Sequence, residues 1–174
     1  MRIEKLKIEN LRNISDADID FSEKINFLKG ANGAGKTTVL EAIYLLARSK
    51  SFTKGTQKTV VQQGKGSMTL YLVGSNRKGE KIRVGLQKTK NITNIKLNGN
   101  PVKKLSEIVK AIPISLITPQ TYKILDEGPE FRRRLINWGV FHVEHQFANV
   151  ARKYTRALAQ RNQALKGSSR DIDI

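Results

Sequence analysis

The sequence contains no cysteine and only two histidines among its 174 residues. Disulfide bonds, thiolate metal sites and thiol nucleophiles are therefore excluded, and a structural zinc site is disfavoured because its usual ligands are missing. No apolar run reaches the roughly 18 residues that a bilayer-crossing helix needs. The first residues, MRIEKLKIENLRNI, also lack the uninterrupted apolar stretch of a secretory signal. We expect a cytoplasmic protein with no membrane partner.

Acidic residues are scarce, since 15 Asp and Glu stand against 32 Lys and Arg and give a net charge of +17. Such an excess attracts polyanions, and every nucleic-acid phosphate that is neutralised releases counterions. An anionic membrane surface is disfavoured because no amphipathic anchor is visible. Nucleic acid is the leading partner. The alternatives are a solubilising surface, or a piece of a longer chain whose acidic remainder is missing.

The first part of the chain predicts strands followed by a helix. Residues 2–10 and 16–21 alternate apolar and polar side chains and predict an antiparallel pair. Residues 24–29 form a short, mostly apolar run before a glycine, which predicts a buried strand. Residues 38–48 predict a core-packed helix, with an apolar face made of Val39, Leu40, Ile43, Leu46 and Ala47.

The rest of the chain predicts more strands and then helices. We expect a polar loop at 50–67, with at most a short helix around 59–62. Strands follow at 68–73, 81–86 and 91–97, and Asn98-Gly99 predicts a hairpin turn after which Val102 pairs back. A short helix at 105–110 and an apolar strand at 112–117 come next. From Pro129 we expect a helix with Phe131, Leu135 and Trp138 on one face, and then a second helix at about 144–165.

The segment GANGAGKT, Gly30 to Thr37, matches the Walker A pattern G-x-x-x-x-G-K-[ST] between a predicted strand and a predicted helix. Its glycines allow successive backbone N–H groups to face a β-phosphate, and the helix start adds a positive dipole end. Lys36 is expected to bridge the β- and γ-phosphates, Thr37 to coordinate Mg²⁺ and Thr38 to reach the α-phosphate. The predicted cofactors are ATP and Mg²⁺, and the predicted ligands are Gly30, Ala31, Asn32, Gly33, Ala34, Gly35, Lys36, Thr37 and Thr38. A glycine-rich turn that binds nothing is the alternative.

The motif alone does not distinguish kinases, GTPases, AAA-type motors and ABC-type heads, but its flanking residues do. NLRNI at 10–14 and FLKGANGAGKTTVLEAIYLL at 27–46 resemble the head of SMC and ABC-type DNA-repair ATPases, and within them the RecF family of recombination mediators. The similarity continues through Ser51-Phe52, LITPQ at 116–120, GPEFRRRLINW at 128–138 and QRNQAL at 160–165.

This resemblance implies an α/β fold, namely a P-loop NTPase of the ABC/SMC-head type. Residues 1–122 would form an ATP-binding lobe I, a mixed sheet with an antiparallel β-subdomain around the Walker A helix, and residues 123–174 would begin a helical lobe II. The family places Arg12 and Asn13 beside the nucleotide phosphates and a Mg²⁺-sensing glutamine at Gln120. A surface role for Arg12 and a plain Pro-Gln turn at Gln120 remain alternatives, since RecF sequences often carry glutamate there.

The resemblance also implies a DNA-repair ATPase that acts at single-strand gaps and junctions and supports recombinase loading, replication restart and the SOS response. Its implied partners are duplex DNA, RecR- and RecO-type mediators and, in the full-length protein, a second copy bound through ATP. Walker B, the signature motif and a switch histidine are not found, and the only Asp-Glu pair, Asp126-Glu127, is interpreted as a loop. We therefore expect an N-terminal portion that binds ATP without significant hydrolysis.

Candidate DNA contacts form a basic stripe in the last predicted helix and two positions in the polar loop; they are Arg152, Lys153, Arg156, Arg161, Lys54 and Lys58. Aromatic residues fall mostly on apolar faces, which disfavours base stacking and favours binding to the duplex backbone. Two other functions stay open. One is a nucleotide-binding regulatory module without turnover, and the other is a small P-loop kinase, against which NLRNI argues.

Overall fold

The computed structural model describes residues 1–53, 60–119, 129–144 and 146–168. The chain forms two compact units, Met1–Ser115 and Leu116–Ile174, and each is described by itself. The predicted lobe boundary between residues 122 and 123 lies outside the described residues.

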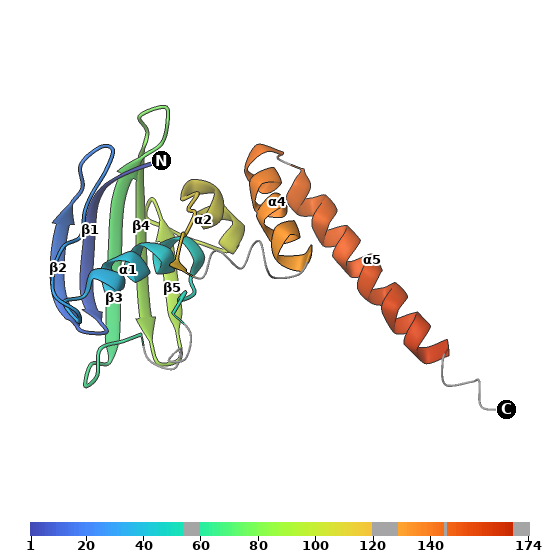
Figure 1. Cartoon of the computed structure of the whole chain (residues 1–174), viewed down its shortest axis with the longest axis horizontal. Coiled ribbons are helices and arrows are strands. Elements are labelled where there is room, and N and C mark those ends of the chain that lie inside the picture. Colours follow the sequence, from blue (N-terminus) through green and yellow to red (C-terminus); the bar gives the residue numbers. More distant parts are fainter. Residues whose placement is uncertain (54–59, 120–128, 145, 169–174) are drawn as a thin grey trace. The chain divides into compact units, whose positions relative to one another are not determined.

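The first unit is built on an antiparallel sheet, shown in Figure 1. Its strands run in the order β2-β1-β3-β4-β5-β6, and each pair of neighbours is antiparallel. The two-residue turn between β5 and β6 has positive φ at Asn98 (51°) and Gly99 (86°), so the predicted hairpin is confirmed. The strands are β1 (Arg2–Leu11), β2 (Ile14–Asp20), β3 (Ser67–Ser75), β4 (Lys81–Thr89), β5 (Thr93–Leu97) and β6 (Asn100–Pro101).

Helix α1 (Lys36–Arg48) covers one face of this sheet and contacts β1, β3 and β4 (Figure 1). The short helix α2 (Leu105–Ala111) packs beside α1 and buries Ile108. The predicted core face of α1 is confirmed except at Leu40, which is 48% exposed. Leu40 follows Val39 by about 100° around the helix, which turns it away from the sheet. The buried core is formed by Leu6, Ile8, Leu11, Val39, Ala42, Ile43, Leu46, Leu70, Leu72, Val84 and Leu86.

Two predicted strands are wrong. Residues 24–29 form no strand, and Phe27 is 90% exposed, since this segment takes part in none of the described strand pairings or bridges. Residues 112–117 are irregular, and Ile117 is 83% exposed. Residues 60–62 are extended rather than helical, since Val61 bridges to Leu11.

The second unit contains the two predicted helices, α4 (Pro129–Val143) and α5 (Phe147–Ser168). Helix α5 begins a few residues later than expected. Leu135, predicted on the apolar face of α4, is exposed. No helix in the described parts of either unit is long and apolar enough to cross a membrane.

Candidate nucleotide-binding site

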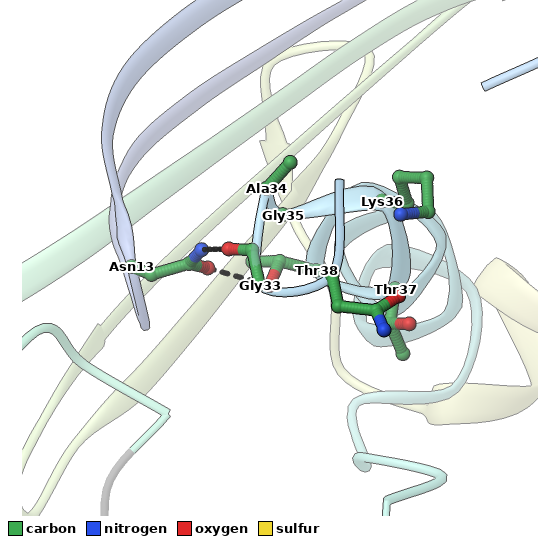
Figure 2. A pocket seen from close by; sticks show the side chains of 8 residues that line it. Asn13, Gly33, Ala34, Gly35, Lys36, Thr37 and Thr38 are labelled. Carbon is green, nitrogen blue, oxygen red and sulfur yellow. Dashed lines mark hydrogen bonds between the residues drawn. The ribbon is translucent and has the colours of Figure 1, made fainter. Parts of the chain in front are cut away.

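The Walker A segment forms a pocket where the loop enters α1, drawn in Figure 2. The cavity measures about 470 Å³ and is lined by Asn13 and by residues 32–38. Pockets for small ligands usually enclose about 300–1,000 Å³. Residues 32–38 of the predicted set therefore share one cavity, together with Asn13.

The start of α1 is arranged to receive an anion. Gly35 is its N-cap, and no side chain caps the free N–H groups of the first turn, which also holds no acidic residue. Gly35 has a φ of 91°, and a Cβ there would lie 3.2 Å from the side chain of Ile14. The backbone conformation thus favours glycine, and a Cβ would also require the Ile14 side chain to shift slightly. Uncapped N–H groups and the helix dipole together favour a phosphate at this point.

Lys36 lies at the same helix start and folds over the loop. Its Nζ donates hydrogen bonds of 2.7 Å each to the carbonyl oxygens of Gly30 and Ala31. A phosphate would compete with these two carbonyls for the ammonium group. The next residue, Thr37, is exposed and lines the pocket, and its hydroxyl is a hard oxygen ligand of the kind that Mg²⁺ prefers. The residues present therefore fit a nucleotide phosphate with its divalent cation.

Asn13 connects the β1–β2 turn to both sides of the pocket. Its Nδ2 donates to the carbonyl oxygen of Gly33 at 2.6 Å, and its Oδ1 accepts from the Thr38 hydroxyl at 2.8 Å. Figure 2 shows both contacts. Asn13 thus lies beside the phosphate loop, where the resemblance places it. The Thr38 hydroxyl is bonded to Asn13, although it was predicted to face an α-phosphate.

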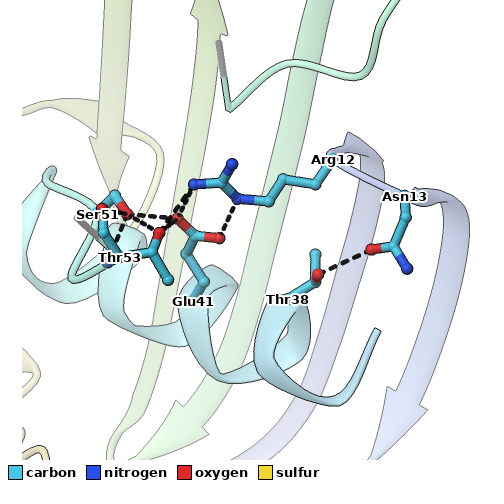
Figure 3. A network of polar contacts seen from close by, with 6 residues as sticks. All are labelled: Arg12, Asn13, Thr38, Glu41, Ser51 and Thr53. Atoms are coloured by element: carbon cyan, nitrogen blue, oxygen red, sulfur yellow. Dashed lines mark hydrogen bonds and ion pairs between the residues drawn. The ribbon is translucent and has the colours of Figure 1, made fainter. Parts of the chain in front are cut away.

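Arg12 is held by a carboxylate that sequence analysis did not select. Its Nη2 donates to Oε1 of Glu41 at 2.7 Å and to the Thr53 hydroxyl at 2.9 Å, and its Nε donates to Oε2 of Glu41 (Figure 3). Arg12 does not line the pocket. In this structure its guanidinium therefore belongs to a polar network on the flank of α1.

Glu41 is the centre of that network and is only 1% exposed. It also accepts hydrogen bonds from the hydroxyls of Ser51 and Thr53. Burial alone would raise the pKa of the Glu41 carboxyl, but the hydrogen bonds from Arg12, Ser51 and Thr53 outweigh it and hold that pKa below its ordinary value. The same contact with Glu41 raises the pKa of Arg12. The one signal in the sequence was an acidic residue within an otherwise apolar helix segment.

The other predicted residues belong to the second unit or lie outside the described residues. Arg152, Lys153, Arg156 and Arg161 are exposed along α5. Gln120, Lys54, Lys58 and the pair Asp126-Glu127 lie outside the described residues. Among the described residues, those that line the pocket include no carboxylate. In the described ranges no group of three or more His, Cys, Asp or Glu side chains is placed to hold a metal ion.

Comparison with known proteins also indicates an ATPase domain. The profile of the AAA ATPase domain family matches residues 1–166. DNA replication and repair protein RecF of Shewanella denitrificans is 39% identical over 170 residues, which is 97% of this chain and 47% of that protein. RecF of Hahella chejuensis is 38% identical over 172 residues, or 97% of this chain and 46% of that protein. The chain thus spans about half the length of the curated relatives it matches.

Solved structures share the fold. The recombination mediator protein RecF with ATP, from the RecFOR pathway, superposes with a TM-score of 0.78 at 24% identity and covers 95% of this chain and 45% of that one. The SMC head domain from Thermotoga maritima gives a TM-score of 0.51 at 25% identity over 62% of this chain and 41% of that one. The predicted α/β P-loop fold of the ABC/SMC-head type is confirmed. This chain belongs to the AAA ATPase domain family and, over nearly its whole length, is similar to RecF.

Proposed function

We propose that this chain binds ATP with Mg²⁺ and forms the nucleotide- and DNA-binding part of a RecF-like DNA-repair ATPase. The observation that carries the proposal is the complete Walker A loop, which ends in an uncapped helix start beside a pocket of ligand size. The names of its relatives, and the ATP complex of RecF, a protein of the same fold, support the repair function and the choice of nucleotide.

Each part of the pocket has a separate task in this proposal. The free N–H groups at the start of α1 hold the phosphate oxygens, and Lys36 exchanges two carbonyl partners for the β- and γ-phosphates. The Thr37 hydroxyl would hold Mg²⁺, which when bound neutralises phosphate charge. Asn13 fixes the Gly33 carbonyl and the Thr38 hydroxyl, so the loop is already shaped before the nucleotide arrives.

The wider functional assignment is also part of the proposal. The whole protein acts in the cytoplasm on duplex DNA and at single-strand/duplex junctions, dimerises with ATP and works with RecR- and RecO-type mediators. It supports recombinase loading, replication restart and the SOS response. The RecF names of the relatives and the net charge of +17 support these statements.

We further infer that this chain holds ATP without significant turnover, as a regulatory nucleotide-binding module would. Hydrolysis requires a group that positions water, in addition to cations that stabilise the γ-phosphate. In the part of the chain that the structure describes, no carboxylate lines the pocket, and Glu41 is engaged by Arg12, Ser51 and Thr53.

The test is equilibrium binding of a fluorescent ATP analogue with and without Mg²⁺. Lys36→Ala should weaken binding by at least about tenfold, since about 1.4 kcal/mol of lost charge-assisted hydrogen bonding has that effect. Lys65→Ala, which removes an exposed lysine from another loop, should leave binding unchanged. Equal affinity of the Lys36 variant and the wild-type chain would contradict the site.

Phosphate release measured on the same samples should stay at background. Release that exceeds background and disappears in Lys36→Ala would contradict the absence of turnover and direct attention to Asp126 and Glu127.

A further inference from the structure

The sheet of the first unit has a second face, opposite α1, on which Tyr71 lies. Strand β3 turns Met68, Leu70 and Leu72 into the core, so Thr69, Tyr71 and Val73 point the other way and are partly exposed. Aromatic residues were expected mainly on apolar faces. Tyr71 is an exception, because it stands at an odd-numbered position in a strand whose even-numbered positions are buried.

Tyr71 lies in a row of residues that crosses four strands. Lys7 of β1 is opposite Tyr71, Tyr71 is opposite Gly85 of β4, and Gly85 is opposite Lys96 of β5. Directly opposed residues have Cβ atoms about 4.5–5.5 Å apart. The aromatic ring is therefore placed between two basic positions, with a glycine on one side.

The glycine leaves room for the ring to lie over the sheet. A Cβ placed on Gly85 would be 3.8 Å from Cδ2 of Tyr71, which puts the ring edge in van der Waals contact with that position. No side chain rises from the sheet there. The ring edge of Tyr71 therefore lies beside the glycine, and its side chain is partly exposed.

Basic and acidic residues occupy different halves of this face. The outward positions of β3, β4 and β5 carry no acidic residue; their basic residues are Arg83, Lys96 and Lys81, and Lys81 pairs with Glu4 of β1. The side chains of Arg83 and Lys96 make no ion pair with any described residue. Strand β2, in contrast, is acidic, and its Asp18 pairs with Lys5 and Lys7. A polyanion is therefore attracted to the β3–β5 half.

We propose that Tyr71, Arg83 and Lys96 form a binding site for single-stranded DNA on this face of the sheet. An unpaired base stacks on the ring of Tyr71, and the flanking phosphates lie over Arg83 and Lys96. Duplex DNA is disfavoured because its bases are stacked on one another and present no free face to a ring lying on a sheet. The inference rests on the proposed DNA partner and gives it a second mode of binding, separate from the basic stripe of α5.

Binding of fluorescein-labelled oligo(dT) to the whole chain tests the site by anisotropy. Tyr71→Ala and Tyr71→Leu should each weaken binding by at least about fivefold, the effect of losing one weakly stacked base, while Tyr71→Phe should retain it. Tyr71→Leu matters because leucine still covers Gly85 but cannot stack. Arg83→Glu combined with Lys96→Glu should weaken binding further, whereas the control pair Lys103→Glu and Lys104→Glu, with the same charge change at exposed positions elsewhere, should not.

Two further measurements distinguish a misfolded variant from the loss of the proposed DNA-binding site. Melting temperature and binding of the ATP analogue should be unchanged in Tyr71→Leu and Tyr71→Phe, which shows that the variants are folded. Unchanged oligo(dT) affinity in Tyr71→Leu, or an equal loss of affinity for a hairpin duplex, would overturn the stacking site. Either result would leave ATP binding through Lys36 standing, because that is measured on its own.

Discussion

Glu41 is a buried residue that sequence analysis did not select and that links two segments of the first unit. It joins the β1–β2 turn, through Arg12, to the segment after α1, through Ser51 and Thr53. The neighbouring Asn13 joins the same turn to the phosphate loop. Two contacts on α1, at Thr38 and Glu41, therefore fix the position of one hairpin turn beside the pocket (Figure 3).

Replacing Glu41 by alanine should lower the free energy of unfolding by about 3 kcal/mol, because the Arg12 guanidinium loses its carboxylate partner in a largely buried place. The measurement is urea unfolding at neutral pH. Asp16→Ala removes an exposed carboxylate with no ion pair among the described residues and should change little.

The same network predicts a pH dependence. The pKa of Glu41 is lowered in the folded state, so its stabilisation is complete above the unfolded value of about 4.3 and is lost as the pH falls through the lower folded pKa. The stability gap between wild type and Glu41→Ala should therefore narrow below about pH 4. A gap that stays constant on acidification would show that Glu41 does not act as a carboxylate.

At the residue scale the sequence predicted which residues line the pocket, but not the contacts that hold the neighbouring Arg12. Residues 32–38 and Asn13 line one cavity, as motif and resemblance indicated. The interaction of Arg12 with Glu41 could not be predicted in the same way. Whether a charged side chain is buried depends on partners 29 positions away in the chain, and helix periodicity carries no information about them.

Among the elements, those whose partners are close in the chain were predicted well. The pairs β1–β2, β3–β4 and β5–β6 are hairpins or near neighbours, and their alternation of buried and exposed residues was readable from the sequence. The apolar runs at 24–29 and 112–117 failed as strands. Apolar composition alone does not supply the hydrogen-bonding neighbours that a strand requires.

The pairing of β1 with β3 gives the second stability prediction. A Cβ on Gly74 would stand 2.3 Å from the carbonyl oxygen of Arg2, which is backbone and cannot move aside cheaply. Gly74→Ala should therefore lower the free energy of unfolding by about 1–3 kcal/mol, the usual cost of overpacking. Gly66→Ala, where a Cβ would meet nothing within 4 Å, is the control. Equal unfolding midpoints for the two variants would contradict the described register.

For the whole molecule, the excess of basic residues predicts binding that depends on salt. The affinity for duplex DNA should fall steeply as salt rises, with a slope of log affinity against log salt of about 0.9 per phosphate contact. Arg152→Glu combined with Arg156→Glu removes two exposed cations from α5 and should reduce that slope. The pair Lys103→Glu and Lys104→Glu should not. Equal slopes for both pairs would mean that α5 is not the duplex-binding surface.

The central claim is that the Walker A loop and its neighbour Asn13 hold a nucleotide by its phosphates. Backbone amide NMR of the ¹⁵N-labelled chain, titrated with ATP and Mg²⁺, tests it most directly. We predict that the signals of Gly33 to Thr38 and of Asn13 shift in saturable fashion, and that Lys36→Ala largely abolishes the shifts. Saturable shifts confined to other residues, with the loop signals unchanged, would contradict the account.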